Sequence, residues 1–226
     1  MKRKKVPTAA QILVERFRAF EQKLYADQLH DDRSMMKSGD RRFWHFRPSH
    51  HVASGLLTQE DVMCLSPSGK RLLSVGASPA FLEKLLPEIG VPAENIVLAD
   101  KDPIRIENAG PLKVVTFDMN DPWPEMGTFD RIIFPESLCI AIGDRLKERG
   151  TAAPSSDAHP NDPLEAELLT SIMREALRRL RPGGIIRANG PMSHPKVVQK
   201  MEEALSRDGI RCDVQYKRYL MDIRIS

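Results

Sequence analysis

From Arg71 onward, short apolar runs alternate with segments of helical spacing, and this alternation restricts the fold more than any other feature. Helical patterns lie at residues 79–89, 163–180 and 194–209. The apolar runs are each short enough for a buried strand and lie at residues 71–75, 95–100, 112–118, 129–134 and 185–190. Strands that alternate with helices form parallel β-α-β units with right-handed crossovers. The sequence therefore predicts an α/β fold with a doubly wound, mostly parallel sheet.

The last two strand-like runs, residues 211–217 and 218–226, follow each other directly. A parallel connection needs a crossover of a dozen or more residues, so these two runs are expected to form a hairpin. One strand near the C-terminus is then antiparallel to the rest of a seven-stranded sheet. The segment 150–162 is rich in proline, serine and alanine and is expected to be a surface loop.

Residues 1–70 have a different character and are expected to form a helical appendage to a domain spanning residues 71–226. Thr8 and Gln11 make a capping-box start, and apolar residues follow at helical spacing. Arginine, histidine and aromatic residues are concentrated between residues 41 and 51. This segment is either a wall of the binding site or an amphipathic stretch that packs on the sheet.

Composition limits the classes of function and partner. The chain has 226 residues and a formal net charge of +3, much of it in the first five residues, "MKRKK". A basic tail of this kind is usually solvated, so nucleic acid is an allowed but not favoured partner. The three cysteines are far apart, no signal peptide is recognisable and no apolar run could span a bilayer. We expect a reduced, cytoplasmic protein without a membrane partner, whose oligomeric state the sequence leaves open.

The turn after the first strand, Gly76-Ala77-Ser78, is the predicted ligand crevice, because open parallel sheets bind ligands beyond the carboxyl ends of their strands. Gly76 permits backbone geometry that a side chain would block. Ser78 and Pro79 suit the N-cap and first position of the following helix. A dinucleotide fingerprint would need a third glycine at Phe81, so a nicotinamide cofactor is the weaker interpretation.

With the smaller residues Gly76, Ser78 and Ala80, "VGASPAFLEKLL" resembles the glycine turn of the class I, Rossmann-like S-adenosylmethionine-dependent methyltransferases. The resemblance runs from Arg71 to the C-terminus, about two-thirds of the chain. It includes "NIVLADKDP", "VVTFDMNDPWP", "FDRIIFPESL" and "ALRRLRPGGIIRANG", in that order. The closing hairpin matches the antiparallel seventh strand of this family, which dinucleotide folds lack.

The resemblance implies a cofactor, S-adenosylmethionine, and a set of residues that bind it. Asp100, next to Lys101, would accept the ribose hydroxyls, for which a carboxylate is suited. Asp118 would face the adenine amine and Met119 would pack on the ring. The other implied contacts come from the turn and the end of the fourth strand: Ser74, Gly76, Ala77, Ser78 and Pro135. The sequence departs from the family at Ser74, where an acid often stands, and at two turn glycines.

Methyl transfer needs alignment of the reactants and sometimes a base for the acceptor's proton. Glu136, at the end of the fourth strand, is the best-placed carboxylate, and His50 and His51 are candidate bases. Trp44, His45 and Arg47 are candidate substrate-binding residues. The histidines lack an obvious second cluster of ligands, so no metal site is predicted.

The leading hypothesis is an S-adenosylmethionine-dependent methyltransferase that acts on a small-molecule acceptor. An RNA or protein methyltransferase is one alternative. A non-catalytic S-adenosylmethionine-binding or scaffold protein of the same fold is another, because the turn and the preceding acid are both altered. The acceptor itself is not encoded in any motif of the sequence.

Overall fold

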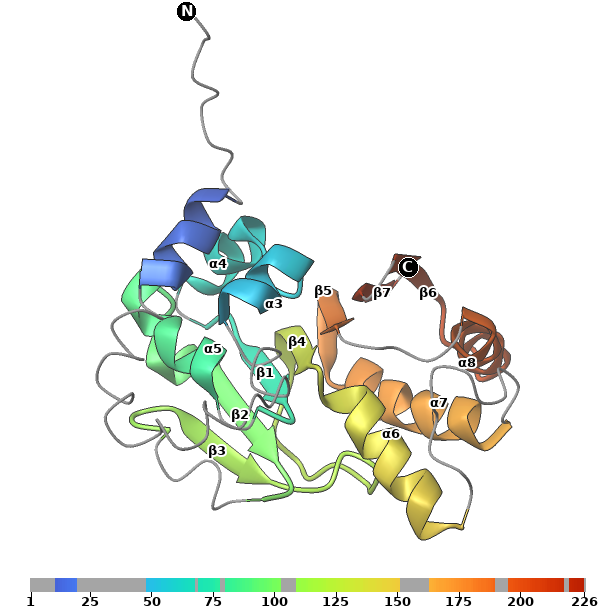
Figure 1. Cartoon of the computed structure of the whole chain (residues 1–226). Coiled ribbons are helices and arrows are strands. Elements are labelled where there is room, and N and C mark those ends of the chain that lie inside the picture. Colours follow the sequence, from blue (N-terminus) through green and yellow to red (C-terminus); the bar gives the residue numbers. More distant parts are fainter. Residues whose placement is uncertain are drawn as a thin grey trace, which may run out of the picture.

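A computed structural model describes residues 11–19, 48–67, 69–77, 80–102, 109–150, 163–189, 195–217 and 220–225. Its centre is a seven-stranded sheet in the order β3-β2-β1-β4-β5-β7-β6 (Figure 1). The strands are β1 Leu72–Val75, β2 Ile96–Asp100, β3 Lys113–Thr116, β4 Phe129–Pro135, β5 Leu180–Asn189, β6 Cys212–Lys217 and β7 Leu220–Ile225.

The strand directions confirm the predicted fold class. β1 pairs in parallel with β2 and β4, β2 with β3, and β4 with β5. β7 is antiparallel to both β5 and β6, as the short connection between the last two runs predicts. The order reverses at β1, whose chain successor β2 lies on one side and β4 on the other. This arrangement opens a crevice at the carboxyl ends of β1 and β4.

The described helices are a segment over residues 11–19, α3 Pro48–Ser54, α4 Gln59–Leu65, α5 Phe81–Leu85, α6 Ser137–Glu148, α7 Pro163–Arg178 and α8 Pro195–Arg207. Short 3-10 turns at Pro87–Ile89 and Ala93–Asn95 follow α5. The helix predicted over 79–89 is thus interrupted, because Pro87 has no backbone N–H to continue the α-helical bonding.

Two details of the sequence interpretation are wrong. The residue that caps α5 is Ala80, in the left-handed conformation with φ 59°, rather than Ser78. The fifth strand begins at Leu180 rather than Ile185 and includes the two glycines. A register shift between Phe129 and Arg131 of the neighbouring strand accommodates them, as a β-bulge does.

Helix α6 is absent from the sequence-based prediction. Its buried residues Leu138, Ile142 and Leu146 repeat at four-residue spacing, which is the signal of an amphipathic helix. The signal is weak because the helix has no side-chain cap and contains a glycine and β-branched residues, which are poor helix formers. This omission matters because α6 begins at the carboxyl end of β4, beside the predicted crevice.

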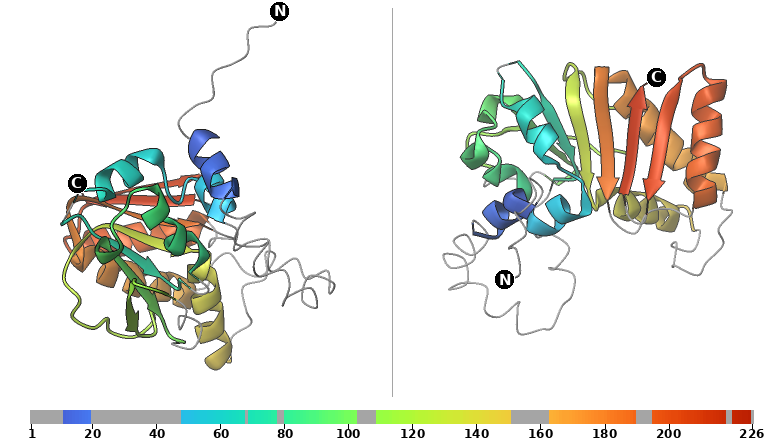
Figure 2. Two further views of the ribbon diagram at one scale, coloured as in Figure 1. Left: turned by 90° about the vertical axis from the view of Figure 1, so that its left-hand side faces the viewer. Right: turned by 90° about the horizontal axis from the view of Figure 1, so that it is seen from above.

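Helices cover both faces of the sheet, so the core has two halves (Figure 2). Residues of α6, α7 and α8 pack against one face, together with Leu73 and Val75 of β1. The helix over 11–19 and α3, α4 and α5 pack against the other face, together with Leu72. The helices before residue 71 therefore share a core with the sheet, and the division at residue 70 stays a prediction. In the described part of the chain, no helix has the length and apolar character to cross a membrane.

Candidate functional site

A cavity of about 120 Å³ lies where the strand order reverses, at the carboxyl ends of β1, β2 and β4. Residues of the turn after β1, of the segment after β3 and of the first two turns of α6 surround it. Its lining residues are Val75, Gly76, Asp100, Lys101, Phe117, Asp118, Met119, Pro135, Ser137, Ile140, Ala141 and Asp144.

The structure brings most of the predicted cofactor-binding residues to this one cavity. Gly76, Asp100, Lys101, Asp118, Met119 and Pro135 all line it. Ser74 and Ala77 are buried in the core and do not line the cavity, and Ser78 lies outside the described residues. Among the described residues of the turn, Gly76 is therefore the one that lines the cavity.

Gly76 is required by its surroundings. Its φ is 71°, and a Cβ built on it would lie 2.2 Å from the Cβ of Ser137 and 3.2 Å from Cε of Met119. The turn is fixed to β2 because the amides of Gly76 and Ala77 both donate to the carbonyl of Ala99, at 2.7 and 3.2 Å. Ser137 donates its hydroxyl to the carbonyl of Val75 at 2.6 Å. No other residue type fits this close approach of the turn to α6.

Ser74 has a partner that the sequence analysis did not identify. Its hydroxyl donates to Oε1 of Glu83 at 2.5 Å, and both side chains are buried. Burial raises the pKa of Glu83 to about 7, against the opposing effect of the Ser74 hydrogen bond. A carboxyl group therefore lies beside position 74 after all, but it comes from α5 rather than from the strand.

The two strand-end acids of the cavity each form a local turn. Asp100 Oδ1 accepts from the amide of Asp102, and Asp118 Oδ1 accepts from the amide of Asn120, both at 2.9 Å. These are Asx turns, which orient the carboxylates relative to the backbone. Asp144 of α6 adds a third acid, 3.4 Å from Nζ of Lys101. Three acids and one lysine line the cavity, so its lining has an excess of negative charge.

Beside Asp118, one buried acceptor lacks a hydrogen-bond partner. Asn120 donates its amide to Oδ1 of Asp118 at 3.0 Å and to the carbonyl of Ala141 at 3.3 Å. Its own Oδ1 is buried, and among the described residues no group donates to it. Leaving such an acceptor unsatisfied costs about 1–3 kcal/mol. Asn120 does not line the cavity, so this cost belongs to the packing of the segment after β3 against α6.

Glu136 and the two histidines predicted as catalytic lie together next to the cavity. Glu136 stands between the lining residues Pro135 and Ser137 and adopts the left-handed conformation, with φ 54°. Nε2 of His50, on α3, is 3.4 Å from Oε1 of Glu136. The side chain of His50 is 52% exposed, whereas that of Glu136 is 8% exposed. An exposed imidazole paired with a buried carboxylate is an arrangement that can take up a proton.

His51 has a different environment from His50. It is 3% exposed, and its Nδ1 lies 3.1 Å from Nδ2 of Asn189, at the end of β5. Asn189 also contacts Ser54 and the backbone of Glu136, so it connects α3 to the end of β4. The sequence offers no motif for Asn189, which is followed in the chain by residues outside the described part.

The remaining predicted residues, Trp44, His45 and Arg47, lie outside the described residues. Within the described ranges, no three histidine, cysteine or acidic side chains gather as a metal-binding group. The lining residues that were not predicted from the sequence are Val75, Phe117, Ile140, Ala141 and Asp144, and the last three belong to the unpredicted helix α6.

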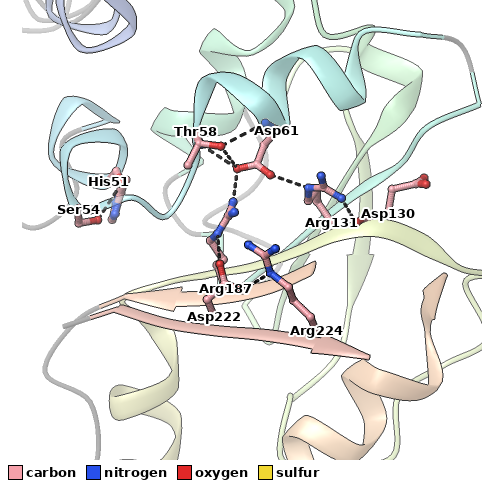
Figure 3. A network of polar contacts seen from close by, with 9 residues as sticks. All are labelled: His51, Ser54, Thr58, Asp61, Asp130, Arg131, Arg187, Asp222 and Arg224. Carbon is pink, nitrogen blue, oxygen red and sulfur yellow. Dashed lines mark hydrogen bonds and ion pairs between the residues drawn. The ribbon is translucent and has the colours of Figure 1, made fainter. Parts of the chain in front are cut away.

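An ion network holds α4 on the sheet beside α3, and Figure 3 shows its members. Asp61 of α4 pairs with Arg131 of β4 at 2.6 Å and with Arg187 of β5. Arg187 also pairs with Asp222 of β7 at 3.0 Å. We call Asp61, Arg131, Arg187 and Asp222 the Asp61 network. It attaches α4, and with it the loop that leads from α3, to three strands of the sheet.

Comparisons with known proteins find solved structures of similar fold but no match by sequence. No protein-family model matches the sequence, and no curated protein matches it. The solved structure of CalS10, an S-adenosylmethionine-bound amino pentose methyltransferase from Micromonospora echinaspora, is similar, with a TM-score of 0.51 and 10% identity. The match covers 77% of this chain and 89% of CalS10.

A second solved structure, TrmN from Thermus thermophilus, is similar with a TM-score of 0.50 and 15% identity. That match covers 82% of this chain and 53% of TrmN. The likeness to CalS10, together with the sheet order and the antiparallel β7, shows that the chain has the Rossmann-like fold of the class I S-adenosylmethionine-dependent methyltransferases.

Proposed function

We propose that this chain is an S-adenosylmethionine-dependent methyltransferase that acts on a small-molecule acceptor. The observation that carries the proposal is the acid-lined cavity at the point where the sheet order reverses. The cofactor site would lie in residues 71–226, and α3 of the preceding appendage would supply part of the wall that faces the acceptor.

The residues present fit this cofactor in their charge. S-Adenosylmethionine carries a positively charged sulfonium, and an excess of acid over lysine in the lining favours a cation. Ligand pockets commonly measure about 300–1,000 Å³, so the cofactor would fill the cavity of about 120 Å³ and extend past its open edge.

Four of the lining residues then have a role in binding the cofactor. Asp100 accepts hydrogen bonds from two ribose hydroxyls, and its Asx turn keeps the carboxylate in place. Met119 and Phe117 supply the apolar contacts for the base. Gly76 allows the turn to approach the ligand without a side chain in the way.

The cofactor, when bound, supplies an electrophilic methyl group. The chain aligns the acceptor with it and removes a proton from the acceptor heteroatom. His50 is the exposed member of the pair with Glu136, and its Nε2–H faces the carboxylate. The acceptor's proton is therefore taken up on the other ring nitrogen, Nδ1. The Glu136 carboxylate then stabilises the imidazolium that forms, because a buried negative charge favours the protonated partner. The reaction is a methyl transfer to an oxygen or nitrogen nucleophile.

Calorimetric titration with S-adenosylmethionine and S-adenosylhomocysteine tests the proposal directly. We expect both to bind, and we expect Asp100→Asn to weaken binding of either ligand by about 1–3 kcal/mol, because the ribose hydroxyls lose an acceptor. The matched control is Asp213→Asn, an exposed acid on β6 at the far edge of the sheet, which should leave affinity unchanged. Absence of heat for both ligands at sub-millimolar concentration would remove the enzyme hypothesis.

A further inference from the structure

We propose that Asn189 is a positioning residue that holds His51 in the neutral tautomer with its proton on Nε2, so that His50 alone of the two histidines serves as the base. The assignment of a base rests on the proposed function. The assignment of the His51 tautomer does not, because it follows from the hydrogen bonds around a single buried amide.

The orientation of the Asn189 side chain is fixed by a backbone group. The amide of Glu136 donates to Oδ1 of Asn189 at 3.1 Å, and a backbone N–H is a donor only. The oxygen of Asn189 must therefore face Glu136, and Nδ2 must face the opposite side. Asn189 is 1% exposed, so its polar atoms are placed by protein partners.

On the opposite side, Nδ2 lies between two groups of α3. It is 3.0 Å from Oγ of Ser54 and 3.1 Å from Nδ1 of His51. Ser54 donates its own hydroxyl proton to the carbonyl of His51 at 2.8 Å, so its oxygen is an acceptor toward Asn189. The two protons of Nδ2 are thus directed at Ser54 and His51, and Nδ1 of His51 has to accept.

An imidazole nitrogen that accepts a hydrogen bond carries no proton. Nδ1 is therefore the unprotonated nitrogen, and the ring proton of His51 is on Nε2. Protonation of Nδ1 of His51 would place an N–H against the NH₂ of Asn189, so that two donors would face each other in a site that is 3% exposed. His51 is therefore a neutral imidazole with its N–H on Nε2. The lone pair of its Nδ1 accepts the hydrogen bond from Asn189 and is not available to take a proton.

The same amide supports the backbone at Glu136. That residue is one of two non-glycine residues in the described chain with positive φ, at 54°, a strained conformation that needs support from its surroundings. The bond from its amide to Asn189 supplies one such support. Asn189 therefore positions two groups beside the base His50. One is Glu136, through its backbone amide, and the other is the imidazole of His51.

Nitrogen-15 spectroscopy of the histidine side chains tests the tautomer without reference to activity. Long-range ¹H–¹⁵N correlations at pH 7 on the full-length protein, assigned with His50→Gln and His51→Gln, should show His51 with a protonated Nε2 and an unprotonated Nδ1. A protonated Nδ1 on His51 in the wild-type spectrum would overturn the proposal by itself.

Asn189→Asp is the sharper variant, since it keeps the acceptor for Glu136 and replaces the donor facing His51 with an acceptor. We expect the proton of His51 to move to Nδ1, or both nitrogens to become protonated. The control is Asn95→Asp, another buried asparagine whose Nδ2 donates to the carbonyls of Leu65 and Pro67; it should leave the His51 signals unchanged. An unchanged His51 pattern in folded Asn189→Asp would contradict the proposal.

Kinetics then separates this inference from the proposed function. With any acceptor found to be methylated, His50→Gln should lower kcat by about 100-fold or more, the usual contribution of a general base. A greater loss of kcat in His51→Gln than in His50→Gln would overturn the choice of base. If S-adenosylmethionine does not bind at all, the proposed function fails, while the spectrum of His51 still decides the role of Asn189 as a positioning residue.

Discussion

Two carboxyl groups, Asp61 of α4 and Glu83 of α5, are buried against the same face of the sheet, and their pKa values are shifted in opposite directions. Asp61 is 0% exposed and Glu83 is 1% exposed. Burial raises the pKa of Asp61, but Arg187, the hydrogen bond from Thr58 and the one from Arg131 outweigh it, so its pKa lies below the usual value. Burial dominates at Glu83 and raises its pKa to about 7, because its main partner is the hydroxyl of Ser74.

The difference shows that the partner, and not the depth of burial, decides whether a carboxyl is charged here. Arginine supplies a full positive charge and a planar set of donors that match a carboxylate. A serine hydroxyl supplies one neutral hydrogen bond. The Asp61 network is therefore a structural tie between α4 and the sheet, while the Ser74–Glu83 pair under the cofactor turn changes its protonation near neutral pH.

The largest expected effect comes from breaking the Asp61 network. Asp61→Asn should lower the free energy of unfolding by about 3–5 kcal/mol at pH 7, because it removes the anion that pairs with Arg131 and leaves the buried Arg187 with Asp222 alone. Urea unfolding measures it, with Asp213→Asn as the exposed control. A loss below 1 kcal/mol would show that the network does not hold α4.

The pH dependence of the Asp61 contribution has a definite sign. Its folded-state pKa is below the ordinary value of 3.8, so the stabilisation is present above that pH and is lost as the pH falls through the folded-state value. The wild type and Asp61→Asn should therefore converge in stability below about pH 4, and a constant difference down to pH 2 would contradict this assignment.

Glu83→Gln is expected to have an effect of the opposite sign and somewhat smaller size. The folded-state pKa of about 7 lies above the ordinary 4.5, so the folded protein binds the proton more tightly and wild-type stability falls as pH rises between these values. The fall amounts to about 3 kcal/mol. Glu83→Gln lacks this fall in stability and should be more stable than the wild type at pH 8.

Urea unfolding at pH 5, 6, 7 and 8 measures the difference between wild type and Glu83→Gln. Ser74→Ala is the matched variant, because it removes the hydroxyl while keeping the buried acid. Parallel pH curves for wild type and Glu83→Gln would show that Glu83 is ionised throughout, as Asp61 is, and would end the contrast between the two groups.

The smallest expected effect on stability comes from Arg224, the more exposed of the two arginines that pair with Asp222. Arg224 pairs with Asp222 at 3.1 Å, but its side chain is 52% exposed, whereas that of Arg187 is 6% exposed. Arg224→Gln should cost less than about 1 kcal/mol, as exposed ion pairs do. A loss comparable to that of Asp61→Asn would extend the buried network to Arg224.

The sequence predicts the sheet well because its strands are local apolar runs with clear boundaries. It also predicts which acids stand at strand ends, so Asp100 and Asp118 were found without the structure, and both line the cavity. Helix α6 was missed because its apolar spacing is diluted by Gly143 and its N-cap, Glu136, makes no side-chain hydrogen bond. The cap of α5 was misplaced because Ala80 adopts a left-handed conformation that no local motif announces.

By itself, then, the sequence determined the fold class, the hairpin at the C-terminus and the place of the turn at Gly76. These depend on patterns within a few residues of each other. Only the tertiary structure decided the partners of the buried polar groups, because those partners are distant in the chain. Arg187 is 126 residues from Asp61, and Asn189 is 138 residues from His51. The sequence around a helical acid does not reveal whether its side chain will contact an arginine or a serine. That contact is what decides the pKa of the buried carboxyl group.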